Sequence, residues 1–306
     1  MLNLCVGLFA LVVALVYIWV QNCYSFWSDR GFVQARPVFP YGNIKGIGYK
    51  EHMCQIITKL YNKHKQGAPM VGMYFFTAPL MLVMDLEIIK HIMVKDFSSF
   101  HDRGMYFNTK DDPLSGHLFS IEGKEWKEMR AKLTPTFTSG KMKTMFNTVL
   151  NISKEMVEFL NKDRPTEFEM KELLCQFTTD VIGNIAFGLE MNCIKDPESI
   201  FRKMGRKIFA TPPLRSMKIF FMMQFRAFAR SLGMRFTDKD VSDFFINSIA
   251  ETVDFREKNN IVRPDFMNLL LQLKNNGNVN DEVEGNGSKI TLNELSAQCF
   301  LFFIAG

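Results

Sequence analysis

The hydrophobic pattern opens with an unbroken apolar stretch near the amino terminus. Residues 2–20 are LNLCVGLFALVVALVYIWV, and only Asn3 interrupts the apolar run. A helix of this length is just long enough to cross the hydrocarbon core of a bilayer. A cleavable signal peptide is the alternative, but such a peptide has a basic start, a shorter apolar run and a small-residue cleavage site. The pattern therefore favours a transmembrane signal anchor over residues 1–22.

The charges after this stretch indicate its orientation. Arg30, Arg36 and Lys45 follow it, with Asp29 as the acid among them. Because positive charge accumulates on the cytoplasmic side of a span, we expect the body of the protein to face the cytosol. The cytosol keeps thiols reduced, so we expect no disulfides among the six cysteines, which are Cys5, Cys23, Cys54, Cys175, Cys193 and Cys299.

The next part of the chain combines a connector with a short β-rich region. Residues 36–43, RPVFPYGN, are stiff because each proline fixes its own φ and disfavours helix at the preceding residue. We therefore expect a linker and hinge over residues 23–48. An amphipathic helix is predicted over 49–65, followed by a hairpin over 70–85 that turns at Thr77-Ala78-Pro79.

The rest of the chain has helical periodicity almost throughout, so the fold class is mainly α with a small β hairpin. Residues 97–119 are the exception, because glycine and proline break any period there. Thr237-Asp238-Lys239-Asp240 resembles a capping box, and Thr291-Leu292-Asn293-Glu294 forms another. The expected helices are 86–94, one before Thr134-Pro135, 142–160, 167–187, 237–257, 263–270 and 295–305, with a loop over 275–289.

Composition and charge exclude several functional classes. The 306 residues can bury a sizeable core, and a net charge of +5 is too small to indicate nucleic-acid binding by itself. Zinc-ligand spacing, a phosphate-binding loop and a G-x-S-x-G elbow are all missing from the sequence. A hydrophobic content of 47%, with 30 Phe and 20 Met, exceeds what an ordinary soluble enzyme needs.

One segment, residues 201–237, is both basic and aromatic. It interleaves seven Phe and five Met with nine cations and contains no acid. This mixture suits a surface in the lipid head-group layer, although single-stranded nucleic acid could also bind aromatic and cationic side chains. The apolar stretch on the same chain favours the membrane over nucleic acid. The cations are Arg202, Lys203, Arg206, Lys207, Arg215, Lys218, Arg226, Arg230 and Arg235.

The strongest candidate for chemistry is a pair of side chains four residues apart. On a helix this spacing puts the Trp126 indole and the Arg130 guanidinium on one face, about one turn apart. Both groups only donate hydrogen bonds, and Arg can bind a carboxylate through two parallel bonds. The pair can therefore hold one carboxylate of a ligand. By spacing alone, a core Trp beside a solvated Arg is the commoner arrangement.

The residues around this pair carry a family resemblance. Trp126 and Arg130 are followed by LTPTFTSGK at 133–141, and this run resembles the C-helix of microsomal cytochrome P450 monooxygenases, closest to the xenobiotic-metabolising, insect-like branch. The resemblance implies that Trp126 and Arg130 bind a haem propionate. The motif FHDRG at 100–104 is similar to a family pattern whose arginine also reaches the propionates, which makes Arg103 a third candidate. A surface Arg103 paired with Asp102 is the alternative.

The resemblance extends along the whole chain to the last helix. The run LNELSAQCFLFFIAG resembles the start of the family's I-helix, and Ala305 and Gly306 match the start of its oxygen-activation motif. Residues 201–237 correspond to the family's F–G region, which lies over the substrate channel. Residues implied to line the substrate cavity are Phe107, Phe119, Phe209, Thr211, Leu214 and Phe302.

The resemblance also implies what this chain lacks. The family's Glu-x-x-Arg pair and axial cysteine would lie beyond Gly306, so no metal ligand is expected in this chain. Cys299 lies on the matching helix but in no ligand motif, and we expect it to serve packing. The chain thus resembles an incomplete cytochrome P450 fold, with a partial haem-thiolate monooxygenase domain over 49–306. By itself it is expected to be inactive.

The function implied by resemblance is that of an endoplasmic-reticulum monooxygenase with haem b as its cofactor. Such enzymes insert one atom of O₂ into apolar substrates (xenobiotics, toxins or endogenous lipophiles). Their electrons come from NADPH through a flavoprotein reductase, and cytochrome b5 is a further candidate partner. A non-catalytic membrane-bound binding or decoy protein, or an incomplete gene model, is the alternative. Candidate docking residues, or simply members of a solvated face, are Lys124, Lys127, Lys132, Lys141 and Lys143.

Overall fold

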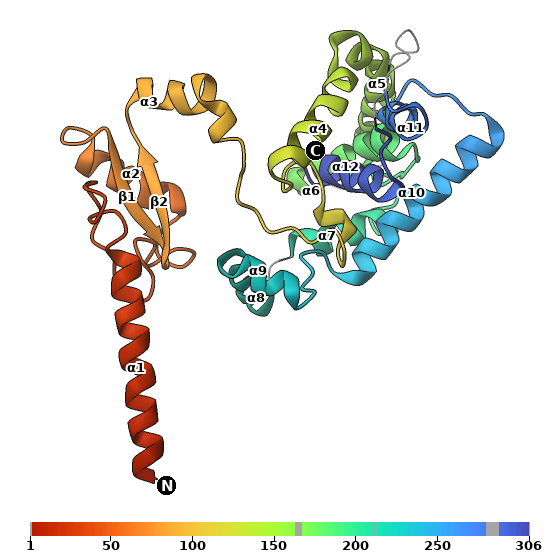
Figure 1. The fold of residues 1–306 in the computed structure, drawn as a ribbon. Coiled ribbons are helices and arrows are strands. Elements are labelled where there is room, and N and C mark those ends of the chain that lie inside the picture. The colour runs from red at the N-terminus through yellow and green to blue at the C-terminus, as the bar shows by residue number, and fades with distance from the viewer. Residues whose placement is uncertain (1, 163–166, 211, 280–287, 306) are drawn as a thin grey trace. The chain divides into compact units, whose positions relative to one another are not determined.

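The computed structural model describes residues 2–162, 167–210, 212–279 and 288–305. The chain forms two compact units, Met1–His101 and Asp102–Gly306, and each is described by itself. Figure 1 follows them along the chain by colour.

The first unit begins with a long apolar helix. Helix α1 covers Leu2–Tyr24 and is exposed along most of its length. Within the described residues, Val6–Tyr24 is the one stretch that is long and apolar enough to cross a membrane. Helix α2 covers Met53–His64, four residues shorter at its start than predicted, because His52 accepts a hydrogen bond from the Cys54 N–H and acts as the amino-terminal cap.

The hairpin follows α2 and agrees with the prediction. Strand β1 (Met70–Phe75) pairs with β2 (Ala78–Val83) in antiparallel register, from Met70 opposite Val83 to Phe75 opposite Ala78. The turn uses a left-handed backbone at Phe76, with φ at +55°. Helix α3 (Leu86–Lys90) runs on into a π-helical turn, His91–Lys95, and completes the unit.

The second unit is almost entirely helical. The expected break at Thr134-Pro135 is a 3₁₀ turn over Thr134–Phe137 that separates the first two helices. The helices of this unit are α4 (Gly123–Leu133), α5 (Ser139–Lys162), α6 (Met170–Ile182), α7 (Ile200–Phe209), α8 (Pro213–Gln224), α9 (Arg226–Ser231), α10 (Lys239–Asn259), α11 (Phe266–Asn276) and α12 (Leu292–Ala305).

Helix α12 runs through the middle of the second unit, with α6, α10 and α11 around it (Figure 1). Its apolar sequence is buried on the side that faces these helices, as expected for a helix inside a core. Phe245 of α10 lies at the centre of an aromatic cluster. Its ring centroid is 5.6 Å from that of Phe187, 5.3 Å from that of Phe300 and 4.8 Å from that of Phe303.

Helix boundaries show where local sequence misleads. The predicted capping box at residues 237–240 is wrong: Asp238 is the amino-terminal cap of α10, but its side chain makes no capping bond. The Thr237 N–H is instead bound by the distant Asp112 carboxylate, 2.8 Å away. The second capping box is confirmed, because Thr291 Oγ1 accepts from the Glu294 N–H and Glu294 Oε2 accepts from the Thr291 N–H.

Helix α11 also differs from the prediction of a short helix over 263–270. It begins at Phe266, because the Asp265 carboxylate accepts from the Asn268 N–H at 2.9 Å, and it continues to Asn276. The expected loop over 275–289 is therefore shorter at its start, and residues 280–287 lie outside the described ranges.

Candidate functional site

Helix α4 has one buried face, and Arg130 lies on its exposed side. Trp126, Met129 and Leu133 are buried at spacings of three and four, so this face packs into the core of the second unit. Arg130, one turn after Trp126, is exposed. The Thr134 hydroxyl donates to the Arg130 carbonyl at 2.7 Å, which helps to end the helix there.

The Arg130 guanidinium has no acid partner in the part of the chain that the structure describes. Among the ion pairs and hydrogen bonds of the described residues, none engages the Arg130 guanidinium. The Trp126 indole next to it is 8% exposed and belongs to the core cluster. A donor-only cation beside a buried indole matches what a propionate needs, so the residues present fit the acid arm of a haem. The geometry is equally that of a core Trp beside a solvated Arg, as the spacing allowed.

Arg103 lies in a segment tied to the start of α4. The Asp102 carboxylate accepts from the Gly123 N–H at 2.7 Å. The guanidinium carbon of Arg103 lies 4.8 Å from the centroid of the Phe119 ring, a cation–π contact.

The last turns of α12 carry the residues matched to the oxygen-activation motif. Phe302 is half-buried, and its ring centroid lies 5.2 Å from that of Phe137 and 4.6 Å from that of Phe266. Ala305 is exposed at the end of the helix, and Gly306 lies outside the described residues. The aromatic trio therefore covers one side of α12.

The remaining predicted substrate residues differ in how far they are exposed in the part of the chain that the structure describes. Phe107 is half-buried beneath the Arg230 guanidinium, whose carbon lies 4.8 Å from the ring centroid. Phe119 is 46% exposed, Phe209 is 63% exposed and Leu214 is 81% exposed. Thr211 falls outside the described residues.

Two buried polar groups hold the 102–119 loop in place, and sequence reasoning missed both. Gln298 of α12 is fully buried, and its Oε1 accepts from the Leu118 N–H at 3.0 Å. Asp112 is also fully buried and accepts from the N–H groups of Phe236 and Thr237 at 3.0 and 2.8 Å. Burial raises the pKa of the Asp112 carboxyl despite these bonds. Of these two contacts, only that of Gln298 had a signal in the sequence, because a polar glutamine stands inside an otherwise apolar helix.

His117 in the same loop is a structural residue. Its Nδ1 lies 3.2 Å from the Ser120 hydroxyl oxygen, and the ring is buried. Burial lowers the pKa of His117 to about 4, because a charged imidazolium loses its hydration there. The ring is therefore neutral at physiological pH.

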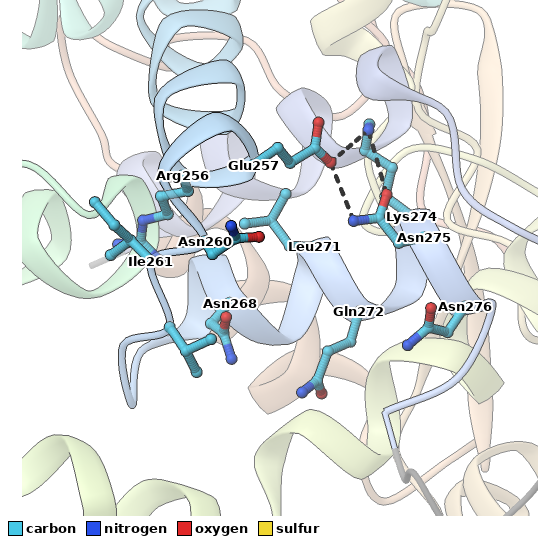
Figure 2. Close-up of a pocket in the computed structure, with 11 residues that line it drawn as sticks. Arg256, Glu257, Asn260, Ile261, Asn268, Leu271, Gln272, Lys274, Asn275 and Asn276 are labelled. Carbon is cyan, nitrogen blue, oxygen red and sulfur yellow. Dashed lines mark hydrogen bonds and ion pairs between the residues drawn. The ribbon is translucent and has the colours of Figure 1, made fainter.

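A polar cavity of about 640 Å³ lies between α10 and α11 (Figure 2). The Glu257 carboxylate lines it and accepts from Lys274 Nζ at 2.9 Å and Asn275 Nδ2 at 3.0 Å. Asn268 and Gln272 of α11 lie along the other side of the cavity. None of the predicted haem or substrate residues lines this cavity, so it is separate from the candidate site.

The basic segment 201–237 is less cationic in the fold than in the sequence. Glu172 accepts from Arg202 Nη2 at 2.8 Å and from Arg206 Nη2 at 2.7 Å, and these two guanidinium groups lower the pKa of Glu172 to about 2. Asp240 binds Lys207, and Glu122 binds Arg226 Nη1 at 3.1 Å. Much of the segment's charge is therefore offset by acids from other helices.

Comparison with known proteins places the chain in a family. The family model described as Cytochrome P450 matches residues 34–306. Cytochrome P450 6A1 of Musca domestica is 43% identical over 295 residues, which cover 96% of this chain and 57% of that protein. Cytochrome P450 6a2 of Drosophila melanogaster is 42% identical over 309 residues, which cover 98% of this chain and 60% of that protein.

The chain thus spans about 60% of the length of these relatives. The family match nevertheless takes in the hairpin, helix α4 and helix α12 in one continuous alignment. A match over this much of its length shows that the chain belongs to the cytochrome P450 family.

Proposed function

We propose that a protein containing this chain is a membrane-bound haem-thiolate monooxygenase. It inserts one atom of O₂ into apolar substrates such as xenobiotics, toxins or endogenous lipophiles. The observation that carries the proposal is the family match from residue 34 onward, together with an Arg130 guanidinium that has no carboxylate partner in the described structure. The relatives are named only as cytochromes P450, so the substrate class rests on the resemblance and on the apolar residues near α12.

Family membership implies haem as the cofactor of the complete protein. Trp126, Arg130 and Arg103 would hold its propionates, because all three carry only donors and two of them carry fixed positive charge. When bound, haem iron supplies the activation of O₂. The buried indole of Trp126 would keep water from one side of this contact.

The thiolate ligand of the haem would come from the part of the relatives' length that this chain does not match. Cys193 and Cys299 are buried, and burial raises the pKa of Cys193 to about 12 and also raises that of Cys299. The Cys299 thiol donates to the Ala186 carbonyl at 3.2 Å, a packing role within the core. Such protonated, enclosed thiols are poor candidates for iron ligands.

The proposed location is the endoplasmic-reticulum membrane, with the body of the protein facing the cytosol. Helix α1 supports anchoring by its length and composition, and Arg30, Arg36 and Lys45 after it support the orientation. An NADPH-dependent flavoprotein reductase, and cytochrome b5 as a second donor, would dock on a basic face. The basic side chains that suit that role are the exposed Lys124 and Lys127 and the half-buried Lys132 of α4, together with Lys141 and Lys143 of α5.

A reduced, carbon-monoxide-bound absorption spectrum tests the proposal. The samples are this 306-residue chain and a chimera in which it is continued by the remaining carboxyl-terminal sequence of the Musca domestica relative. We expect a thiolate-type haem band for the chimera alone, because only the chimera contains the proposed ligand. A thiolate band from the 306-residue chain would contradict the assignment of the ligand. A folded chimera that takes up no haem would contradict the proposed function.

A further inference from the structure

The carboxyl-terminal end of α1 is fixed by side chains from later in the chain. The Tyr24 carbonyl lies 2.9 Å from the Tyr74 hydroxyl and accepts from Gln34 Nε2 at 3.1 Å. The last carbonyls of a helix have no partner within the helix, and in a free tether they would face water. Here β1 and the segment after α1 provide the partners.

Tyr74 is the centre of this junction. Its side chain is fully buried, and its hydroxyl also lies 2.8 Å from Gln34 Oε1 and accepts from the Trp27 N–H at 3.3 Å. The hydroxyl has one proton, so Tyr24 and Gln34 share it as acceptors. The Tyr24 and Tyr74 rings pack edge to face with centroids 5.2 Å apart, and the Tyr24 hydroxyl accepts from the Gly42 N–H at 3.2 Å.

A second contact joins the turn after α1 to the same strand. The Trp27 indole lies directly over Gly72 of β1, where a Cβ atom would come within 2.3 Å of the ring. Only glycine permits this approach. Trp27 Nε1 donates to the Met73 carbonyl at 3.3 Å, and Val20 in the last turns of α1 is buried against the same cluster. The junction is therefore packed as well as hydrogen-bonded.

Aromatic and cationic side chains surround this junction on the exposed side. Phe32 is 40% exposed and packs on Trp27 with ring centroids 5.7 Å apart. Phe39 is 62% exposed and lines a cavity of about 370 Å³ together with Gln21 of α1. Trp19 is half exposed on α1 itself. We call Trp19, Phe32 and Phe39 the collar.

We propose that α1 and the hairpin form one rigid block, and that this block seats the collar in the lipid head-group layer at the end of α1. The proposal rests on the membrane anchoring given under Proposed function. The lipid surface is the partner because the exposed apolar face of α1 continues into the collar, where Arg30 and Arg36 stand among the aromatic rings. Aromatic rings and cations are the side chains that favour this layer.

Distance measurement between two spin labels tests the rigid block. Labels are attached to Leu15→Cys and Leu80→Cys in the full chain, with the native cysteines replaced by serine, in nanodiscs of phosphatidylcholine and phosphatidylserine. Both positions are exposed, at 56% and 43%, so the labels disturb little. We expect a single narrow distribution that broadens at least twofold in Tyr74→Phe/Gln34→Ala.

Tyr41→Phe is the matched control, because it removes the hydroxyl of a half-exposed tyrosine that takes no part in the junction. It should leave the distribution narrow. A broad distribution in the unmutated junction, or no change in the double variant, would overturn the rigid block. Circular dichroism confirms that the variants keep their helix content, so loss of folding is recognised separately.

The collar is tested by the accessibility of a label at Phe39→Cys to oxygen, which concentrates in lipid, and to a water-soluble nickel chelate. We expect at least threefold less contact with the chelate than for a label at Lys63→Cys, on exposed α2. Equal contact at the two positions would overturn the seating. Extraction of the chain from the membrane at alkaline pH would contradict the anchoring itself, whereas the rigid block can still be measured in detergent micelles.

Discussion

Polar groups have hydrogen-bond partners at the junction after α1, whereas the Arg130 guanidinium on the exposed side of α4 has no acid partner in the described structure. In the first unit Tyr74, Gln34 and the Tyr24 carbonyl satisfy one another inside the chain. In the second unit the Arg130 guanidinium projects from α4, and no acid of the described structure neutralises it. If Arg130 serves a ligand, as proposed, its loss should affect binding more than stability. Loss of the contacts around Tyr74 should instead affect the stability of the first unit.

The largest expected effect on the free energy of unfolding comes from a buried ion pair inside the second unit. Arg256 Nη1 and Nη2 donate to the Asp265 carboxylate at 2.8 and 2.6 Å, with both side chains buried. Arg256→Leu leaves a buried carboxylate without its main partner, so we expect a loss of about 3–5 kcal/mol in the free energy of unfolding. Urea denaturation of the 306-residue chain measures it.

Lys258→Met on the same helix is the control for this change. It removes an exposed ion pair with Asp254, and such pairs contribute about 0–1 kcal/mol. If Arg256→Leu cost no more than Lys258→Met, the buried contacts of this unit would not be what holds it together.

The buried His117 ring makes the stability of the second unit depend on pH. Its pKa is about 4 in the folded chain, below the usual value for histidine, so the unfolded chain binds more protons between these values. The contribution is complete above about pH 6.5 and is lost as the pH falls toward 4. By the difference between these pKa values it is on the order of 3 kcal/mol.

The measurement is the free energy of unfolding from pH 7.5 to pH 4, compared between the unmodified chain and His117→Gln. Between pH 6.5 and 4 the variant should lose less stability, because it has no imidazole to charge. Parallel pH profiles for the two proteins would show that His117 is not held neutral by burial.

A smaller effect is expected at the bond that joins α12 to the 102–119 loop. Gln298→Leu leaves the Leu118 N–H without its acceptor, at a cost of about 1–3 kcal/mol. Amide hydrogen exchange at Leu118 should accelerate accordingly. Ser296→Ala is a matched control on the same helix, because the buried Ser296 hydroxyl has no hydrogen-bond partner among the described residues. Unchanged amide exchange at Leu118 in Gln298→Leu would show that this hydrogen bond does not protect the loop.

The parts of the fold that were predictable are those whose signal is local. The hairpin follows from β-rich runs on either side of Thr77-Ala78-Pro79, and the cap of α12 follows from Thr291 and Glu294. The candidate haem pair was visible because Trp126 and Arg130 are four residues apart and sit in a distinctive run.

The parts that were missed depend on residues far apart in sequence. Gln298 meets Leu118 across 180 positions, and Asp112 binds the Thr237 N–H across 125. Counting charges within residues 201–237 likewise failed to anticipate Glu172, which lies outside the segment and forms ion pairs with two of its arginines. Spacing in the sequence cannot reveal contacts that only the packed helices create.

The central claim is that Arg130 serves a ligand and not the fold. The most direct test compares Arg130→Ala with the unmodified protein in two measurements: urea denaturation of the 306-residue chain and haem affinity of the chimera by titration. We expect the free energy of unfolding to change by less than about 0.5 kcal/mol, as for an exposed residue, while haem affinity falls by roughly 10- to 100-fold. An unchanged haem affinity in the variant chimera would contradict this claim.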